Sequence, residues 1–83
     1  MKPIRYTRHA KNRKRWHKIS DQQIELCLSN PEWREKSIYG RINAWKRVGD
    51  RFLKVTYIEE ENEFLLISTV FKRNMPDKEV SEK

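Results

Sequence analysis

The chain has 83 residues, of which 19 are Lys or Arg and 12 are Asp or Glu, so it carries a net charge of +7. This length predicts one domain, and the apolar runs are far shorter than the roughly 20 residues that cross a bilayer, which favours a cytoplasmic protein. The single cysteine excludes an internal disulfide and a cysteine-based zinc site. Residues 1–20 hold eight basic side chains and no acidic one, an imbalance that predicts an anionic partner, either nucleic acid or an acidic protein.

The N-terminal part of the chain predicts a short strand and two helices. The segment 3–7, PIRYT, alternates apolar and polar residues, as a strand does. Thr7 is the predicted N-cap of a helix over residues 8–18. Ser20 is followed three residues later by a glutamine, a capping-box pattern that predicts a second helix over residues 21–30.

The remaining sequence predicts a meander of strands, over residues 32–39, 41–48, 51–58 and 64–73. Gly49-Asp50 predicts a two-residue hairpin turn with glycine in the first position. The last strand is nearly all apolar, so we expect it to be central and covered on both faces. Residues 74–83 predict a flexible polar tail, which leaves residues 1–73 as the domain. This order predicts an α+β fold, β-α-α-β-β-β-β, with two N-terminal helices packed on one face of an antiparallel sheet.

The segment HAKNRKRWHKIS resembles the opening pattern of a small bacterial domain family of undetermined function, grouped with the RelE/ParE and BrnT toxins. The pattern places a His-Ala pair at His9, an arginine at Arg13 and an Ile-Ser pair at Ile19. The hairpin VGDRFLKVTY and the strand LLISTVFKR extend the resemblance over residues 4–73. The chain departs from the family at three positions. It has Lys14 where the family has an apolar residue, His17 where the family has an arginine, and Lys18 where the family has a glycine. The resemblance implies a RelE-like fold, whose active members cleave messenger RNA without a metal.

Metal-independent RNA cleavage needs a base for the 2′-hydroxyl, an acid for the leaving oxygen and cations around the phosphate. The sequence has no Gly-rich phosphate loop and no spaced set of metal ligands, so it predicts no cofactor. His9 is the best candidate for the base, because imidazole titrates near neutral pH. The alternative for His9 is a structural role against the sheet. The predicted catalytic set is His9, Arg13, Arg41, Lys54 and Lys72.

Other basic side chains are candidates for holding nucleic acid, with solubility as the alternative role for any one of them. Trp45 is a candidate for base stacking, because its predicted strand face also carries arginines. Trp16 and Trp33 are expected to pack in the core, and His17 to lie on the surface. The predicted nucleic-acid-binding set is Arg8, Lys11, Lys14, Arg15, Lys18, Trp45, Lys46, Arg47 and Arg73.

The sequence leaves three functions open. The first is a RelE/BrnT-like endoribonuclease acting on mRNA, a toxin with an acidic antitoxin as its partner. The second is a non-catalytic RNA- or DNA-binding module of the same fold, and phosphate attraction does not distinguish it from the first. The third is a protein-interaction domain that docks an acidic partner by strand addition. A homodimer is open in all three.

Overall fold

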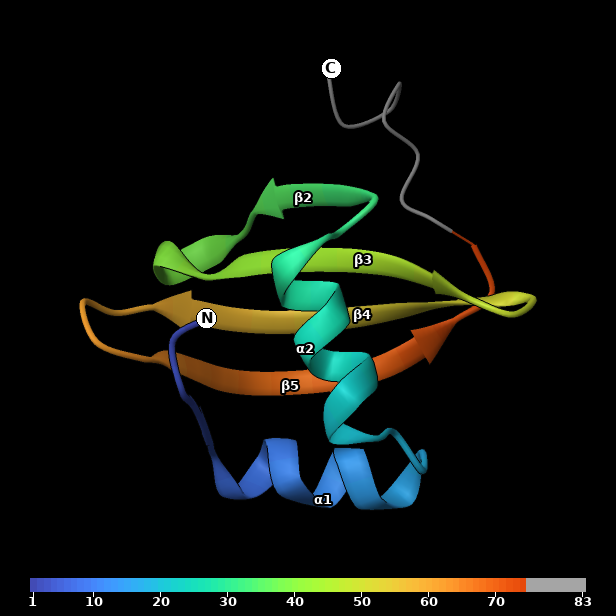
Figure 1. Ribbon diagram of the computed structural model, residues 1–83, viewed down its shortest axis with the longest axis horizontal. Helices are drawn as coiled ribbons and strands as arrows, with labels where there is room; N and C mark the ends of the chain where they lie inside the picture. The colour runs from blue at the N-terminus through green and yellow to red at the C-terminus, as the bar shows by residue number, and fades with distance from the viewer. Residues whose placement is uncertain (75–83) are drawn as a thin grey trace.

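The structure, a computed structural model, describes residues 1–74 and has two helices and a five-stranded sheet (Figure 1). The elements in chain order are β1 (Ile4–Tyr6), α1 (Arg8–Trp16), α2 (Asp21–Ser29), β2 (Trp33–Lys36), a 3-10 turn (Ile38–Gly40), β3 (Ile42–Val48), β4 (Arg51–Glu59) and β5 (Phe64–Lys72). This arrangement confirms the α+β class and the predicted order of elements. Except for Asn74, the predicted tail lies outside the described residues.

The sheet has the strand order β1-β5-β4-β3-β2. Strands β2 to β5 form the predicted antiparallel meander. β1, however, pairs with β5 in parallel, with Ile4 opposite Phe64, so the sheet is mixed rather than antiparallel. β5 is therefore second from one edge, and only Leu66 and Thr69 of it are buried. The expectation that β5 is covered on both faces is wrong, because both helices bury side chains in one core.

Both helices begin at side-chain caps that the sequence predicts. The Thr7 hydroxyl accepts a hydrogen bond from the backbone N–H of Ala10 at 3.1 Å. Ser20 and Gln23 form a complete capping box, in which each side chain accepts from the other residue's backbone N–H. These bonds satisfy N–H groups that have no partner inside the helix.

α1 ends two residues earlier than predicted, in a Schellman motif. The backbone N–H of Ile19 donates to the carbonyl oxygen of Lys14 at 2.9 Å, and the backbone N–H of Lys18 donates to the carbonyl oxygen of Arg15 at 3.2 Å. This closure puts Lys18 in the left-handed region, with φ of 56°. Glycine usually occupies this place, and a side chain there costs about 1 kcal/mol.

The core lies between the helices and one face of the sheet. Figure 1 shows α2 crossing in front of β3 and β4, and α1 running beside β5. The core is formed mainly by Ala10, Ile19, Ile24, Cys27, Leu28, Ala44, Leu53, Val55, Tyr57 and Leu66. The opposite sheet face, which carries Trp45, Lys54 and Val70, is not covered by either described helix, and we call it the uncovered face.

The connections around β3 differ from one another in how well the sequence predicts them. Gly49 has φ of 65° and opens a two-residue turn between Val48 and Arg51, as predicted. The predicted strand over 32–39 ends early, at Lys36. Tyr39 takes a left-handed conformation in the 3-10 turn, and its side chain is 84% exposed.

Candidate nucleic-acid interface

The uncovered face consists of side chains that meet across neighbouring strands. Their register follows from the alternation of each strand, which sends every second residue to this side. The pairings form three rows, which are Trp33–Trp45–Lys54–Val70, Arg47–Phe52–Lys72 and Glu35–Asn43–Thr56–Ser68. Two rows therefore combine aromatic and basic side chains, and the third is polar.

The polar row is held by hydrogen bonds between side chains. Asn43 donates from Nδ2 to Oε2 of Glu35 at 3.1 Å, and Thr56 donates from Oγ1 to Oδ1 of Asn43 at 2.7 Å. Asn43 is only 8% exposed, so these bonds satisfy an amide that would otherwise be costly to bury. The row therefore joins β2, β3 and β4 by side-chain hydrogen bonds on this face.

Trp45 is buried even though no described helix covers it. Its side chain is 4% exposed, and Nζ of Lys54 lies 5.4 Å from the ring centroid. A cation over the face of an indole ring is attracted to it. The Lys54 ammonium therefore takes the place where a base was expected to stack, and Trp45 acts here as a support for Lys54.

Four basic side chains of the predicted sites share the uncovered face. Arg47, Lys54 and Lys72 lie within its rows, and Arg41 precedes β3 in the same alternation. In the part of the chain that the structure describes, none of these four forms an ion pair with a carboxylate. Cations without carboxylate partners are what a phosphate backbone requires.

Two of the other predicted residues lie elsewhere. Lys46 is on the helix-covered face and forms an ion pair with Glu32 at 3.6 Å, so the structure separates it from Lys54 and Lys72. The reason is the strand alternation, which sends residue 46 to the side opposite residues 45 and 47. Arg73 follows the end of β5 and is exposed.

One side of α1 carries His9, Arg13 and Trp16 at spacings of four and three residues, which place them in one stripe. Nε of Arg13 donates to Nε2 of His9 at 3.5 Å. His17 caps the helix end and is half-buried, with Nε2 enclosed and without a hydrogen-bond partner in the described chain. His9 and Arg13 of the predicted catalytic set therefore lie side by side, whereas His17 is less exposed than expected.

Trp16 is a candidate for base stacking that the sequence analysis assigns to the core instead. Its side chain is 78% exposed, so the expectation that it packs in the core is wrong. The reason is that α1 lies beside β5 and buries only Ala10 of its own residues. The spacing from His9 and Arg13 is the sequence signal that places Trp16 on this stripe.

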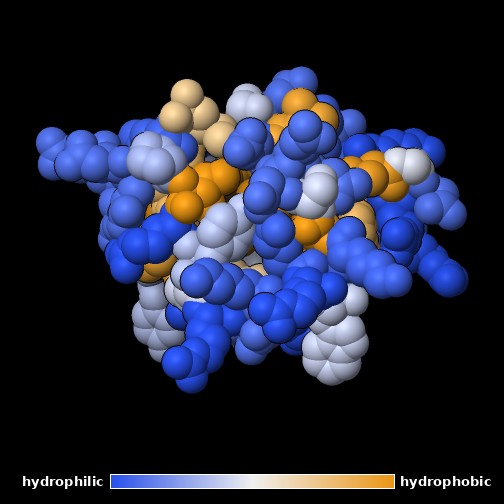
Figure 2. Space-filling view, turned by 60° about the horizontal axis from the view of Figure 1, so that its bottom comes forward, coloured by the Kyte–Doolittle hydropathy of each residue, from blue (hydrophilic) through white to orange (hydrophobic). Residues whose placement is uncertain are grey.

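The other side of α1 carries Lys11, Lys14 and Arg15, which together with Lys18 line a pocket beside the start of α2. Because this side is turned toward α2, the His9 stripe lies on the opposite side of α1. Arg8 is exposed at the first turn of α1. Figure 2 shows the molecule from the α1 side, with hydrophilic residues over most of the surface and apolar residues in the hollows between them.

Residues 1–74 offer neither a cluster of metal ligands nor a membrane-spanning helix. No group of three His, Cys, Asp or Glu side chains among them is placed to hold a metal ion. Neither α1 nor α2 is long and apolar enough to cross a membrane. Comparisons of the chain with protein-family models, with curated proteins and with solved structures gave no match.

Proposed function

We propose that this chain is an RNA-binding domain of RelE-like fold, which holds single-stranded RNA across the uncovered face and along the His9 stripe of α1. The observation that carries the proposal is the set of four cations on that face, Arg41, Arg47, Lys54 and Lys72, without a carboxylate partner in the described chain. Elsewhere the basic side chains in and before β1 are neutralised, Lys2 by Glu59 at 3.0 Å and Arg5 by Glu63 at 2.7 Å. The surplus positive charge is therefore concentrated on selected surfaces, where phosphates would bind.

A single strand fits this surface better than a duplex. Trp16 projects from α1 with 78% of its side chain exposed, next to Arg13 and His9. An exposed indole ring stacks on unpaired bases, which a duplex keeps inside its own stack. The cations of the sheet would hold phosphates while Trp16 holds a base.

The test is the affinity for a single-stranded oligoribonucleotide, measured by fluorescence anisotropy at several salt concentrations. We expect Lys54→Ala and Lys72→Ala each to weaken binding and to reduce the slope of log affinity against log salt by about one. Lys46→Ala is the matched control, because it removes the same charge from the other face and should change both quantities much less. An equal effect of Lys46→Ala would show that net charge, and not this face, attracts RNA.

We propose as a second function that the domain is a metal-independent endoribonuclease, a toxin of the RelE/BrnT type. The supporting observation is the contact between Nε of Arg13 and Nε2 of His9 at 3.5 Å, because it places a cation beside a side chain that can act in acid-base catalysis. His9 would take the proton of the 2′-hydroxyl, Arg13 would stabilise the crowded phosphate, and Lys54 or Lys72 would protonate the leaving oxygen. Arg41 lies at the other end of the sheet from Lys72, where it would hold a neighbouring phosphate of the strand. An acidic antitoxin would occupy the same cations.

Cleavage is tested by incubating RNA with the protein in chelator, while binding is followed in parallel. We expect fragments with the wild type, and a loss of about 10²-fold or more with His9→Ala or Lys72→Ala at retained binding. Intact RNA that stays bound and is released by salt would support the binding function and contradict cleavage of free RNA.

A further inference from the structure

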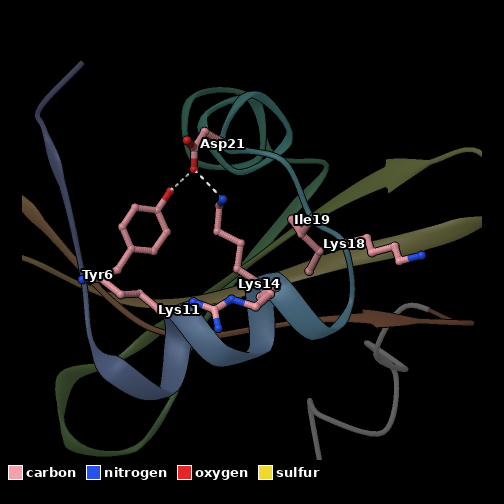
Figure 3. A pocket seen from close by; sticks show the side chains of 7 residues that line it. Tyr6, Lys11, Lys14, Lys18, Ile19 and Asp21 are labelled. Atoms are coloured by element: carbon pink, nitrogen blue, oxygen red, sulfur yellow. Dashed lines mark hydrogen bonds and ion pairs between the residues drawn. The ribbon is translucent and has the colours of Figure 1, made fainter.

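A pocket of about 440 Å³ lies between α1 and the start of α2, on the side of α1 opposite the His9 stripe (Figure 3). Its volume is in the range of pockets that hold small organic ligands. Its walls combine cations with an aromatic ring and an aliphatic side chain, and the lining residues are Tyr6, Lys11, Lys14, Arg15, Lys18, Ile19 and Asp21.

The only carboxylate in this lining is already engaged. Nζ of Lys14 lies 2.9 Å from Oδ1 of Asp21, and the Tyr6 hydroxyl donates to the same oxygen at 3.1 Å (Figure 3). These two interactions hold the pKa of the Asp21 carboxyl below its ordinary value. Asp21 and Lys14 thus neutralise each other, which leaves Lys11, Arg15 and Lys18 as surplus positive charge.

Lys11, Arg15 and Lys18 follow one another at spacings of four and three residues, so they lie along one side of the helix and its C-terminal turn. Within the described residues none of them forms an ion pair. Figure 3 shows Lys11 and Lys18 at opposite ends of the pocket, with their side chains extended away from each other, so a bound anion would draw these exposed side chains together. Three unpaired cations along one pocket suit an anion with several acceptor oxygens.

The backbone at Lys18 is the second, independent observation. This residue holds φ of 56° at a position where a helix end favours glycine. The Schellman closure and the burial of Ile19 need that backbone conformation but not the lysine side chain, for which no hydrogen bond or ion pair occurs in the described chain. The fold therefore explains the backbone conformation of Lys18 but gives no structural reason for a lysine, in place of glycine, beside the pocket.

We propose that this pocket binds a phosphomonoester, with Lys11, Arg15 and Lys18 as the cations that hold the phosphate. A phosphomonoester is close to a dianion at neutral pH and offers three acceptor oxygens. The Tyr6 ring and Ile19 would contact the organic group that the phosphate carries. The site does not rest on the proposed function, because it lies on the other side of α1 from the His9 stripe and uses none of the four cations of the uncovered face. The phosphate is supplied either by a free nucleotide or by the 5′ end of an RNA strand.

The test compares binding of adenosine monophosphate and adenosine to the full chain by isothermal titration calorimetry at low salt. We expect the monophosphate to bind at least tenfold more tightly than the nucleoside. We expect Lys18→Gly to weaken binding of the monophosphate about tenfold, because a charge-assisted hydrogen bond is lost. The same substitution should raise the urea midpoint of unfolding, because glycine fits this backbone conformation. Lys18→Asn, a neutral residue that tolerates this conformation, should weaken binding equally.

Further binding experiments distinguish the two sources of the phosphate and test other ligands. If a 5′-phosphorylated oligoribonucleotide binds more tightly than its 5′-hydroxyl form, and does so only when Lys18 is present, the ligand is the 5′ end of RNA. If the phosphate raises the affinity of the mononucleotide alone, the ligand is a free metabolite. Lys46→Ala is the control of equal charge and should leave monophosphate binding unchanged. The proposal is overturned if Lys18→Gly stabilises the fold without weakening monophosphate binding, or if a glutamate-rich peptide binds this pocket more tightly than the monophosphate.

Discussion

The two faces of the sheet are built from the same strands and differ in nearly everything else. Along β4, Leu53, Val55 and Tyr57 are buried under the helices, whereas the residues between them, such as Lys54 and Thr56, are half-exposed on the uncovered face. One strand thus contributes stability on one side and binding groups on the other, because its side chains alternate. The comparison teaches that a shift of one position changes which property a mutation affects.

The most direct test of this comparison is to truncate two neighbouring side chains on β4, one on each face. Leu53 is fully buried, so Leu53→Ala should lower the free energy of unfolding by about 2–5 kcal/mol. Lys54→Ala should change it by about 0.5 kcal/mol or less while weakening RNA binding. Urea unfolding of both variants measures the difference. A loss of stability with Lys54→Ala as large as with Leu53→Ala would show that the uncovered face belongs to the core.

Local patterns predict most of the fold, because each depends on residues close together in the chain. The Ser20 capping box and the Gly49 turn are examples, and both are confirmed. The parallel pairing of β1 with β5 is not predictable in this way. It joins Ile4 to Phe64, sixty residues further along the chain, and a strand of three residues carries no local sign of its partner.

The candidate sites are predictable only in part. Alternation along β3 predicts that Trp45 and Arg47 share a face, and the same alternation places Lys46 on the other one. The exposure of Trp16 is not predictable from periodicity, because it depends on how far α1 overlaps the sheet. The pocket depends in turn on where α2 docks, although the spacing of its cations along α1 is visible in the sequence.

The pH dependence of stability that Cys27 causes is a further test of the comparison, because it reports how well the covered face excludes water. Its thiol donates to the carbonyl oxygen of Ala44 at 3.3 Å, and burial, with a smaller effect of the Glu32 charge, raises its pKa to about 12. The unfolded thiol loses its proton above pH 9.0, while the folded one keeps it. Stability from this group is therefore full below pH 9.0 and falls as the pH rises toward 12, by up to about 1.4 kcal/mol per pH unit.

The measurement is the free energy of unfolding at pH 8 and pH 10 for the wild type and for Cys27→Ala. The tyrosines titrate in both proteins, so the difference between the two slopes isolates the thiol. Cys27→Ala should be less stable at pH 8 but should lose less stability on going to pH 10. Equal slopes would mean that water reaches the thiol in the folded protein.

The smallest expected effects come from one substitution made on both faces. Thr56 donates to Asn43 on the uncovered face, whereas the Thr69 hydroxyl, on the covered face, is buried without a hydrogen-bond partner in the described chain. Valine has the same shape as threonine and lacks the hydroxyl. Thr56→Val should therefore destabilise the fold by about 1 kcal/mol, because Asn43 loses its donor.

Thr69→Val should be neutral or should stabilise the fold by up to about 1 kcal/mol, because it removes a polar group that burial leaves unsatisfied. Both variants keep the branched side chain that a strand favours, so strand propensity cancels between them. Urea midpoints of the two proteins, measured at one pH, give the sign of each change. Opposite signs mean that the uncovered face is held by side-chain hydrogen bonds and the covered face by apolar packing. Two losses of equal size would instead mean that the Thr69 hydroxyl has found a partner inside the core.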